Sequence, residues 1–394
     1  MAPRPSLLRL SLMSALVLVS ACKKQSETAK PEDAKQTAPQ AAGTAPQAKA
    51  LKVGLVTDVG GRGDHSFNDS ALRGLELWGA GKKVEGGSYT DASPAELKES
   101  LTQDLASREI APVGVTPVVL QSKVAEDYEP NLQLLVDQNA ALSVGVGFML
   151  ENAVETVAKR NTDSKFLLID SPLVGSDGKP YTLPNVRAVV FQEQEGSFLV
   201  GALAGLASQG GKLGFVGGME VPLIKKFEAG FRAGVAATNP KATVLVNYTG
   251  SFDKVAAGKQ VAQDLLAKGV DVIYQAAGSD GLGVIQAVKE ARDANKMVFV
   301  IGVDSDQAHL APDAVLTSMV KRVDLAVYEA VRDLTQNKFQ GGDVSLGLKE
   351  GGVTYAPVRV EFPNRAEALE KVEELRARIV SGELKVPAHP SELK

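Results

Sequence analysis

The sequence predicts an α/β protein whose parallel sheets are divided between two lobes. Short apolar runs recur along the chain, and most are followed by Gly, Asp or Ser and then by a helical pattern. Strands that alternate with helices form βαβ units, which give parallel sheets with right-handed crossovers. About ten strands and about 340 residues beyond the N-terminal segment exceed one sheet and one core. The runs are Val53–Val56, Val118–Leu120, Leu142–Val146, Phe166–Ile169, Ala188–Phe191, Leu213–Val216, Val244–Tyr248, Val270–Tyr274 and Val298–Val303.

The stretch Leu51–Gly74 predicts the first strand, loop and helix of this fold. An apolar run ends at Asp58, and a loop with three glycines follows it. Glycine allows the positive φ angles that tight loops require. Ser66 and Asp69 have the spacing of a capping box, with Asp in place of the usual Glu or Gln, so we expect a helix to begin there. That helix is predicted to run toward Trp78.

The side chains that follow this first strand are candidates for ligand contact. In open α/β sheets, ligands bind beyond the carboxyl ends of the strands, where Asp58, Phe67 and Asn68 are expected to lie. An aromatic ring at the first turn of a helix fills a core poorly but can stack on a flat ligand. Trp78 falls instead on the apolar face of the same helix, so it is predicted to be a core residue.

The N-terminus predicts export and attachment to a membrane through a lipid. Arg4 and Arg9 come first, the apolar segment Leu10–Val19 follows, and small residues lead to Cys22. This is the pattern of a secretory signal, and it is too short to span a bilayer as a mature helix. Cys22 is the only cysteine, and its placement resembles that of the acylated cysteine in a bacterial lipobox. We therefore expect residues 1–21 to be cleaved. The alternative is an incidental buried cysteine.

The segment after the cysteine and the net charge narrow the choice of partners. Residues 22–50 are rich in Ala, Gln, Pro, Lys and Thr and have no large apolar side chain, which predicts a flexible tether. The formal charge of −4 becomes −6 when Arg4 and Arg9 are removed (−4 − 2). A protein with this charge is not expected to bind nucleic acid.

Two later segments break the alternation of strand and helix. Lys83–Pro117 has several Gly and Pro residues around one charged helix, Ala95–Ser107, and we interpret it as an insertion on the first lobe. Ala366–Ile379 is amphipathic and highly charged, which predicts a surface helix. Its packed positions are expected to be Leu369, Val372 and Leu375.

Nine blocks of the sequence follow one another in the order of a known family. They are DVGGRGDHSFN (58–68), VGVGF (144–148), FLLID (166–170), FQEQEGSFLVGALAG (191–205), FEAGFRAG (227–234), YTGSFD (248–253), AAGSDGLG (276–283), VIGVDSDQ (300–307) and LTSMVKR (316–322). Together they resemble the basic membrane protein family, over essentially all of residues 51–385. Its members are lipoprotein substrate-binding proteins of ABC transporters, and the best-understood ones bind purine nucleosides.

The resemblance implies a type I periplasmic-binding-protein fold, in which two αβα lobes are joined by three hinge crossings around a ligand cleft. We expect the N-terminal lobe to comprise 51–187 with 304–338, and the C-terminal lobe 188–303 with 339–394. The crossings are expected near 185–190, 303–316 and 338–350. Two features depart from the family pattern: the insertion at 83–117 is long, and Arg62-Gly63 stands where an acidic or apolar pair is commoner.

Three carboxylates and one lysine are the charged candidates for the ligand site. Asp58, Asp170 and Asp304 each end a predicted strand. Taken singly, each fits a helix cap or a turn, but three at strand ends in both lobes favour a site. A carboxylate can accept two ligand N–H or O–H groups. By resemblance, Asp58 and Asp170 would face a base, and Asp304 with Lys321 the ribose. The alternative for Lys321 is a solvated helix lysine.

Aromatic and small residues complete the predicted site. Phe67 and Phe252 follow strand ends in polar surroundings, and two such rings from opposite lobes could sandwich a purine. Phe148 is a further candidate, while Phe227 could simply be a helix core residue. Gly278 and Gly283 allow the backbone to approach a ligand closely, although a βα turn also needs a glycine. Ser279 is a weaker candidate beside them.

No catalytic or metal motif assembles in the sequence, so no enzyme activity, cofactor or metal is expected. The three histidines are scattered, and none lies beside the cysteine in a metal-ligand spacing. There is no G-x-S-x-G or Walker A motif. We expect a monomeric binding protein that delivers a nucleoside to membrane permease subunits. The alternatives are the same fold with a sugar or signalling molecule as ligand, or an exported α/β enzyme suggested by GFVGG (214–218).

Overall fold

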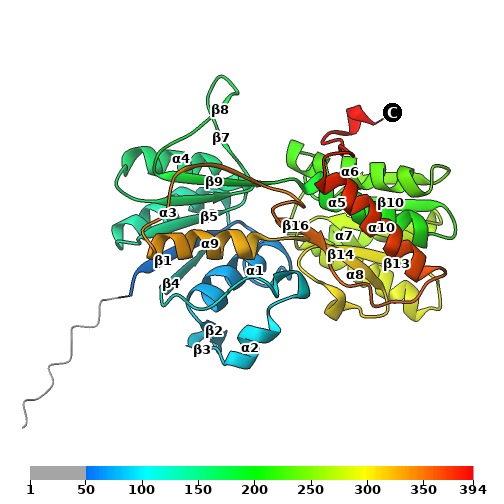
Figure 1. Cartoon of the computed structure of the whole chain (residues 1–394), viewed down its shortest axis with the longest axis horizontal. Coiled ribbons are helices and arrows are strands. Elements are labelled where there is room, and N and C mark those ends of the chain that lie inside the picture. Colours follow the sequence, from blue (N-terminus) through cyan, green and yellow to red (C-terminus); the bar gives the residue numbers. More distant parts are fainter. Residues whose placement is uncertain (1–49, 394) are drawn as a thin grey trace, which may run out of the picture. The chain divides into compact units, whose positions relative to one another are not determined.

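The computed structural model describes residues 50–393, which are organised around two six-stranded sheets with flanking helices (Figure 1). The predicted α/β fold with two lobes is therefore confirmed. A small hairpin of β7 (Leu173–Val174) and β8 (Pro180–Tyr181) lies outside these sheets. The predicted signal peptide, the tether up to residue 49 and Cys22 lie outside the described residues. Among the described residues, no helix has the length and apolar character needed to cross a membrane.

The first lobe is built on a sheet in which every strand runs parallel to its neighbours, in the order β15-β9-β6-β5-β1-β4. Its strands are β1 (Lys52–Thr57), β4 (Thr116–Gln121), β5 (Leu142–Val146), β6 (Phe166–Ile169), β9 (Val186–Phe191) and β15 (Gly342–Leu346). Its helices are α1 (Phe67–Leu72), which continues as a π-helix (Arg73–Gly79), α3 (Tyr128–Asp137), α4 (Glu151–Arg160) and α9 (Val323–Thr335). All residues of β5 and β6 are buried, as expected for central strands covered on both faces.

The second lobe repeats this design in the order β11-β10-β12-β13-β14-β16, and only β16 is antiparallel to its neighbour. Its strands are β10 (Lys212–Gly217), β11 (Thr243–Tyr248), β12 (Val272–Ala276), β13 (Phe299–Asp304), β14 (Val315–Lys321) and β16 (Val353–Tyr355). Its helices are α5 (Glu193–Ala207), α6 (Pro222–Thr238), α7 (Val255–Ala267), α8 (Asp280–Asp293) and α10 (Arg365–Val380). Helix α10 confirms the predicted C-terminal helix, with Val372 and Leu375 buried.

The chain crosses between the sheets three times, as predicted. The first crossing follows β9 at Gln192 and the second follows β14 at Arg322, both later in the chain than expected. The third lies between β15 and β16. The predicted division placed 304–338 in the first lobe, whereas β14 pairs with β13 in the second. It also placed 339–394 in the second lobe, whereas β15 pairs with β9 in the first. Strand β15 alternates between half-buried and exposed residues, so no apolar run revealed this edge strand.

The insertion predicted at 83–117 contains a hairpin and a helix that is shorter than expected. Strands β2 (Lys82–Glu85) and β3 (Ser88–Asp91) pair, and α2 spans Pro94–Glu99. The predicted helix continued to residue 107. It ends early where the Ser100 hydroxyl donates to the carbonyl of Leu97 and accepts from the indole N–H of Trp78, an alternative to continued helical bonding. Trp78 is fully buried, so the prediction that it is a core residue is confirmed.

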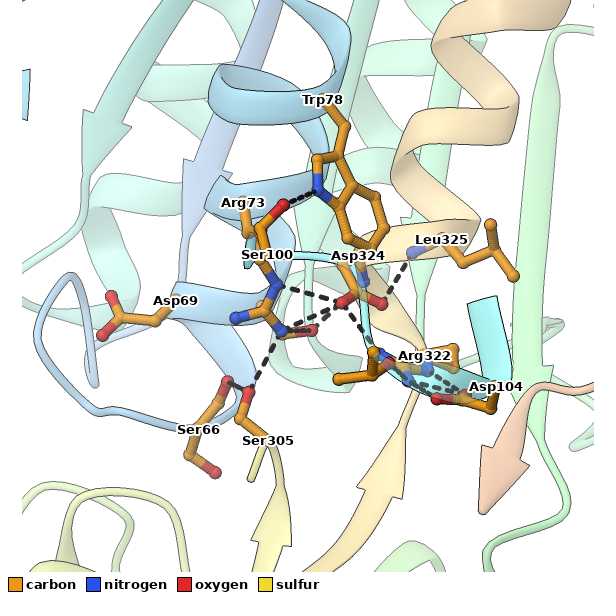
Figure 2. Close-up of polar contacts among 12 residues, drawn as sticks. Ser66, Asp69, Arg73, Trp78, Ser100, Asp104, Ser305, Arg322, Asp324 and Leu325 are labelled. Carbon is orange, nitrogen blue, oxygen red and sulfur yellow. Dashed lines mark hydrogen bonds and ion pairs between the residues drawn. The ribbon is translucent and has the colours of Figure 1, made fainter. Parts of the chain in front are cut away.

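The insertion holds the second crossing between the lobes through a chain of charged side chains. Figure 2 shows the Arg322 guanidinium beside the carboxylates of Asp104 and Asp324, at 2.6 and 3.4 Å. Asp324 also pairs with Arg73 at 2.9 Å, and Arg73 reaches the hydroxyl of Ser305 at 3.3 Å. Because Arg322 directly follows β14, this network fixes the point at which the chain leaves the second sheet.

Replacing Asp104 with Asn should destabilise the protein because it leaves the buried Arg322 guanidinium with one carboxylate partner fewer. We expect the free energy of unfolding to fall by about 1–2 kcal/mol. Asp91→Asn is a matched control, since the Asp91 side chain is 86% exposed and pairs with Lys82. It should change stability by less than about 0.5 kcal/mol. Urea unfolding of both variants measures the difference, and equal effects would show that the insertion does not stabilise the crossing.

Candidate ligand-binding site

A cavity lies where the carboxyl ends of strands from both sheets meet, the edge at which parallel α/β sheets bind ligands. Residues that follow β1, β5 and β6 line it from the first lobe, and residues that end or follow β12, β13 and β14 line it from the second. All but one of the residues that the sequence predicted as ligand contacts lie in its wall; the exception is Gly283. The predicted residues in the wall are Asp58, Phe67, Asn68, Phe148, Asp170, Phe227, Phe252, Gly278, Ser279, Asp304 and Lys321.

The ammonium of Lys321 is the centre of the charged part of the cavity. The side chain is 2% exposed, and Nζ lies 2.5 Å from Asp170, 3.8 Å from Glu193 and 3.9 Å from Asp304. Burial alone would lower the pKa of Lys321, but the surrounding carboxylates raise it above its usual value. The ammonium also lies 4.8 Å from the ring centre of Phe67. Lys321 ends a buried strand, so its interpretation as a solvated helix lysine is wrong.

Asp304 joins the two lobes at the wall of the cavity. The hydroxyl of Ser66, at the start of α1, donates to Asp304 Oδ2 at 2.6 Å. The hydroxyl of Ser305 donates to the carbonyl of Ser66 at 3.1 Å. Burial raises the pKa of Asp304 to about 6, although Lys321 and Ser66 oppose the shift. Ser66 therefore bonds across the lobes and makes no side-chain cap bond, contrary to the capping box predicted for it.

Asp64 caps α1 in place of Ser66. Its carboxylate accepts from the backbone N–H groups of Ser66, Asn68 and Asp69 at 2.8 to 3.1 Å. These bonds fix the backbone of Asn68 at the start of α1. The side-chain amide N–H₂ of Asn68 donates to Asp64 at 3.1 Å and to Asp58 at 2.8 Å. Both Asn68 donors point to carboxylates, so its Oδ1 is buried without a partner among the described residues. The loop geometry thus leaves an acceptor in the cavity wall.

Asp58 combines the role of a turn residue with a place in the cavity. Its Oδ1 accepts from the backbone N–H of Gly60 at 2.8 Å, which is the turn role considered for it from the sequence. The same side chain lines the cavity. Burial raises the pKa of Asp58 to about 6, in spite of the hydrogen bonds from Asn68 and Gly60.

Four phenylalanines supply apolar surface to the cavity. Phe148 and Phe252 come from opposite lobes and meet edge to face, with ring centres 6.2 Å apart and an interplanar angle of 74°. Phe67 lies at the start of α1, and Phe227 is a buried residue of α6 that nevertheless lines the cavity. The cavity thus combines flat apolar surface with a charged cluster around Lys321.

The profile of a family described as "ABC transporter substrate-binding protein PnrA-like" matches residues 51–390. The chain belongs to this family. Within it, the chain is 32% identical over 362 residues to "ABC transporter nucleoside-binding protein BmpA" of Lactococcus lactis, covering 88% of this chain and 92% of the relative. It is 33% identical over 342 residues to "Basic membrane protein A" of Borreliella burgdorferi, covering 86% and 88%. A solved ABC transporter solute-binding protein from Aeropyrum pernix has 30% identity and a TM-score of 0.69, covering 86% of this chain and 94% of that one.

These matches confirm the predicted resemblance and fold. Membership of the PnrA-like family makes the protein a substrate-binding protein of an ABC transporter and not an enzyme. The alternative of an exported α/β enzyme is therefore not supported.

One predicted residue does not belong to the site, and two residues near it were not predicted. Gly283 does not line the cavity; a Cβ there would lie 1.9 Å from the carbonyl oxygen of Val255, so this glycine permits close packing of α8 on α7. Asp64 was not among the predicted residues, although an Asp just before a helix is a cap signal. Glu193 was also missed: it begins α5 fully buried, 3.0 Å from Lys226.

The raised pKa of Asp58 predicts how stability depends on pH. Between its ordinary value of 3.8 and about 6, the folded state binds more protons at Asp58 than the unfolded state, so stability falls as pH rises through this range. Asn at this position does not titrate. The unfolding free energy of Asp58→Asn, relative to the unsubstituted protein, should therefore rise by about 2 kcal/mol from pH 4 to pH 6 and level off above about pH 7. A difference that does not change with pH, in ligand-free denaturant titrations, would contradict this assignment.

Proposed function

We propose that the protein captures a purine nucleoside in the cavity between its lobes and delivers it to the permease of an ABC transporter. The observation that carries the proposal is a set of buried acceptors without partners in the cavity wall. Oδ1 of Asn68 and Oδ1 of Asp170 have no hydrogen-bond partner among the described residues. An unpaired buried acceptor costs about 1–3 kcal/mol, so a ligand that donates N–H and O–H groups would be stabilised there.

The polar groups form two sets that suit the two halves of a nucleoside. Asp58 and Asn68 are hydrogen-bonded to each other and offer acceptors to the N–H edge of a base. Asp304 and Lys321 form the second set and offer an acceptor and a donor to adjacent ribose hydroxyls. Asp170, bonded to Lys321, lies between the lobes and could accept from either half. Charge-assisted bonds of this kind are stronger than neutral ones and favour a ligand with several donors.

The aromatic residues favour a planar ligand over a simple sugar. Phe67, Phe148, Phe227 and Phe252 present apolar surface from both lobes, and stacking on a base contributes about 1–3 kcal/mol per base. The Lactococcus lactis relative is named as a nucleoside-binding protein. A sugar or a signalling molecule remains the second candidate, since carboxylates also bind hydroxyl groups, but such a ligand would make little use of these rings.

The same proposal includes the place where the protein works. The signal-like segment before Cys22 supports acylation of that cysteine and anchoring of the chain to the outer face of a membrane, with the following residues as tether. A chain anchored in this way could close its lobes on a ligand and present it to membrane permease subunits. In cell fractionation, Cys22→Ser should move the protein from the membrane fraction to the soluble fraction. If the variant stays in the membrane fraction, a lipid on Cys22 is not the anchor.

Calorimetric titration with a nucleoside and its 2′,3′-dideoxy analogue tests how the site divides its work. Phe67→Ala should weaken binding of all purine nucleosides by a similar amount, about 1–3 kcal/mol, because stacking does not depend on the sugar. Asp304→Asn keeps a residue that tolerates the positive φ of 62° at this position. It should cost about 2 kcal/mol or more with the nucleoside and much less with the analogue, since the lost acceptor serves the ribose hydroxyls.

Phe339→Ala is the matched control for the aromatic substitution, because Phe339 is partly buried against Arg187 and does not line the cavity. Its affinity for both compounds should equal that of the unsubstituted protein. If Asp304→Asn keeps the full preference for the ribonucleoside, Asp304 does not bind the sugar. If the unsubstituted protein binds no purine nucleoside, the proposed ligand is wrong.

A further inference from the structure

A second cavity lies on the other side of the contact between Ser66 and Asp304. Its volume is about 710 Å³, and it is lined by the insertion, by the segment after β13 and by the region around β16. Neighbouring residues of two segments line different cavities: Asp64 and Asp304 face the ligand cavity, whereas His65 and Ser305 line the second one. The second cavity is therefore a separate space bounded by both lobes.

Two histidines from opposite lobes face each other in its wall. His65 lies in the loop before α1, and His309 lies in a short 3-10 helix (Ala308–Leu310) after β13. Nδ1 of His65 lies 3.4 Å from Nε2 of His309, and the ring centres are 5.4 Å apart. Two nitrogens that each lie about 2.0–2.1 Å from one tetrahedral zinc ion are about 3.3–3.4 Å apart. The observed spacing falls in this range, and the rings as they stand are also within N–H···N hydrogen-bond distance of each other.

Hydrogen bonds hold the ring of His309 and the backbone of His65 in this arrangement. Nδ1 of His309 faces the carbonyl of Asp306 at 3.3 Å, which leaves Nε2 as the nitrogen turned toward His65. A bond from the second ring nitrogen to a carbonyl is the usual way in which a metal-binding imidazole is oriented. His65 adopts a positive φ of 51°, which is uncommon for a residue other than glycine. Its N–H donates to Asp69 at 3.0 Å, and its carbonyl accepts from Gln307 at 3.1 Å.

The charges around the pair do not exclude a cation. The cavity is also lined by three arginines, but each pairs with a carboxylate: Arg73 with Asp324, Arg322 with Asp104, and Arg376 with Glu373. The carboxylates of Asp69 and Asp306 line the same cavity, the latter paired with Arg359 at 2.8 Å. Both imidazoles are exposed, so an ion can reach them from the solvent.

We propose that His65 and His309 together bind one divalent transition-metal ion of the zinc class, which links the two lobes at this cavity. Among the described residues, no group of three or more His, Cys, Asp or Glu gathers around a possible ion. The protein thus supplies two imidazole ligands and water completes the coordination. Imidazole suits Zn²⁺, Ni²⁺ and Cu²⁺, whereas Mg²⁺ and Ca²⁺ prefer oxygen ligands.

The test is calorimetric titration of the full chain, free of any histidine tag, with Zn²⁺ and separately with Mg²⁺. We expect one Zn²⁺ per chain and no heat of binding with Mg²⁺. His65→Asn removes the imidazole and introduces a residue that tolerates the positive φ at this position, and His309→Ala removes the facing ring. Each substitution should weaken Zn²⁺ binding at least about tenfold. His389→Ala is the control, because the ring of His389 instead bonds to Ser391 in the C-terminal segment.

Thermal unfolding provides a second readout that does not depend on the heat of binding. Zn²⁺ should raise the unfolding temperature of the unsubstituted protein and of His389→Ala, since an ion that binds only the folded state stabilises it. Zn²⁺ should not change the unfolding temperature of His65→Asn or His309→Ala. Absence of Zn²⁺ binding in the unsubstituted chain would overturn the proposal. Undiminished binding in either substituted variant would also overturn it, because a shared ion needs both rings.

Discussion

The proposed binding site depends on one buried cation, the ammonium of Lys321. It lies at the end of β14 and is approached by Asp170 from the first lobe, Asp304 from the second and Glu193 at the first crossing. A buried ammonium without partners would cost several kcal/mol, so these carboxylates must stay close to it. Because its partners come from both lobes, the same contacts that keep Lys321 charged also link the two lobes.

Some polar groups around Lys321 lack hydrogen-bond partners within the described part of the chain, as is expected of a site that binds a ligand. Asp170 and Asp304 both adopt positive φ angles, 71° and 62°, which are uncommon for such residues and are maintained by their surroundings. Asp170 Oδ1 and Glu193 Oε1 lack hydrogen-bond partners among the described residues. The first lobe adds Asn68, whose donors are both used within the loop. Unpaired acceptors and backbone strain concentrate here, while the strands and helices around them follow ordinary packing rules.

The sequence was informative wherever the signal was local. Apolar runs predicted the buried parallel strands. Asp304 was predicted to lie near the ligand because a carboxylate at the end of such a run lies at the carboxyl edge of the sheet, and it does line the cavity. Sheet membership is not local, so β14 and β15 were assigned to the wrong lobes. Glu193 gave no signal because an acidic residue at the start of a helix is ordinary. The contact between the rings of His65 and His309 could not be predicted either, because the two residues are 244 positions apart in the sequence.

If the cavity between the lobes holds a purine nucleoside, the protein should carry one from the cell in which it is made. The protein would be purified without added ligand and unfolded, and the released small molecules would be identified by mass spectrometry. We expect an intact purine nucleoside in a ratio approaching one per chain, and a strongly reduced amount from an otherwise folded Asp304→Asn variant. Release of a sugar or another non-aromatic molecule in that ratio would contradict it.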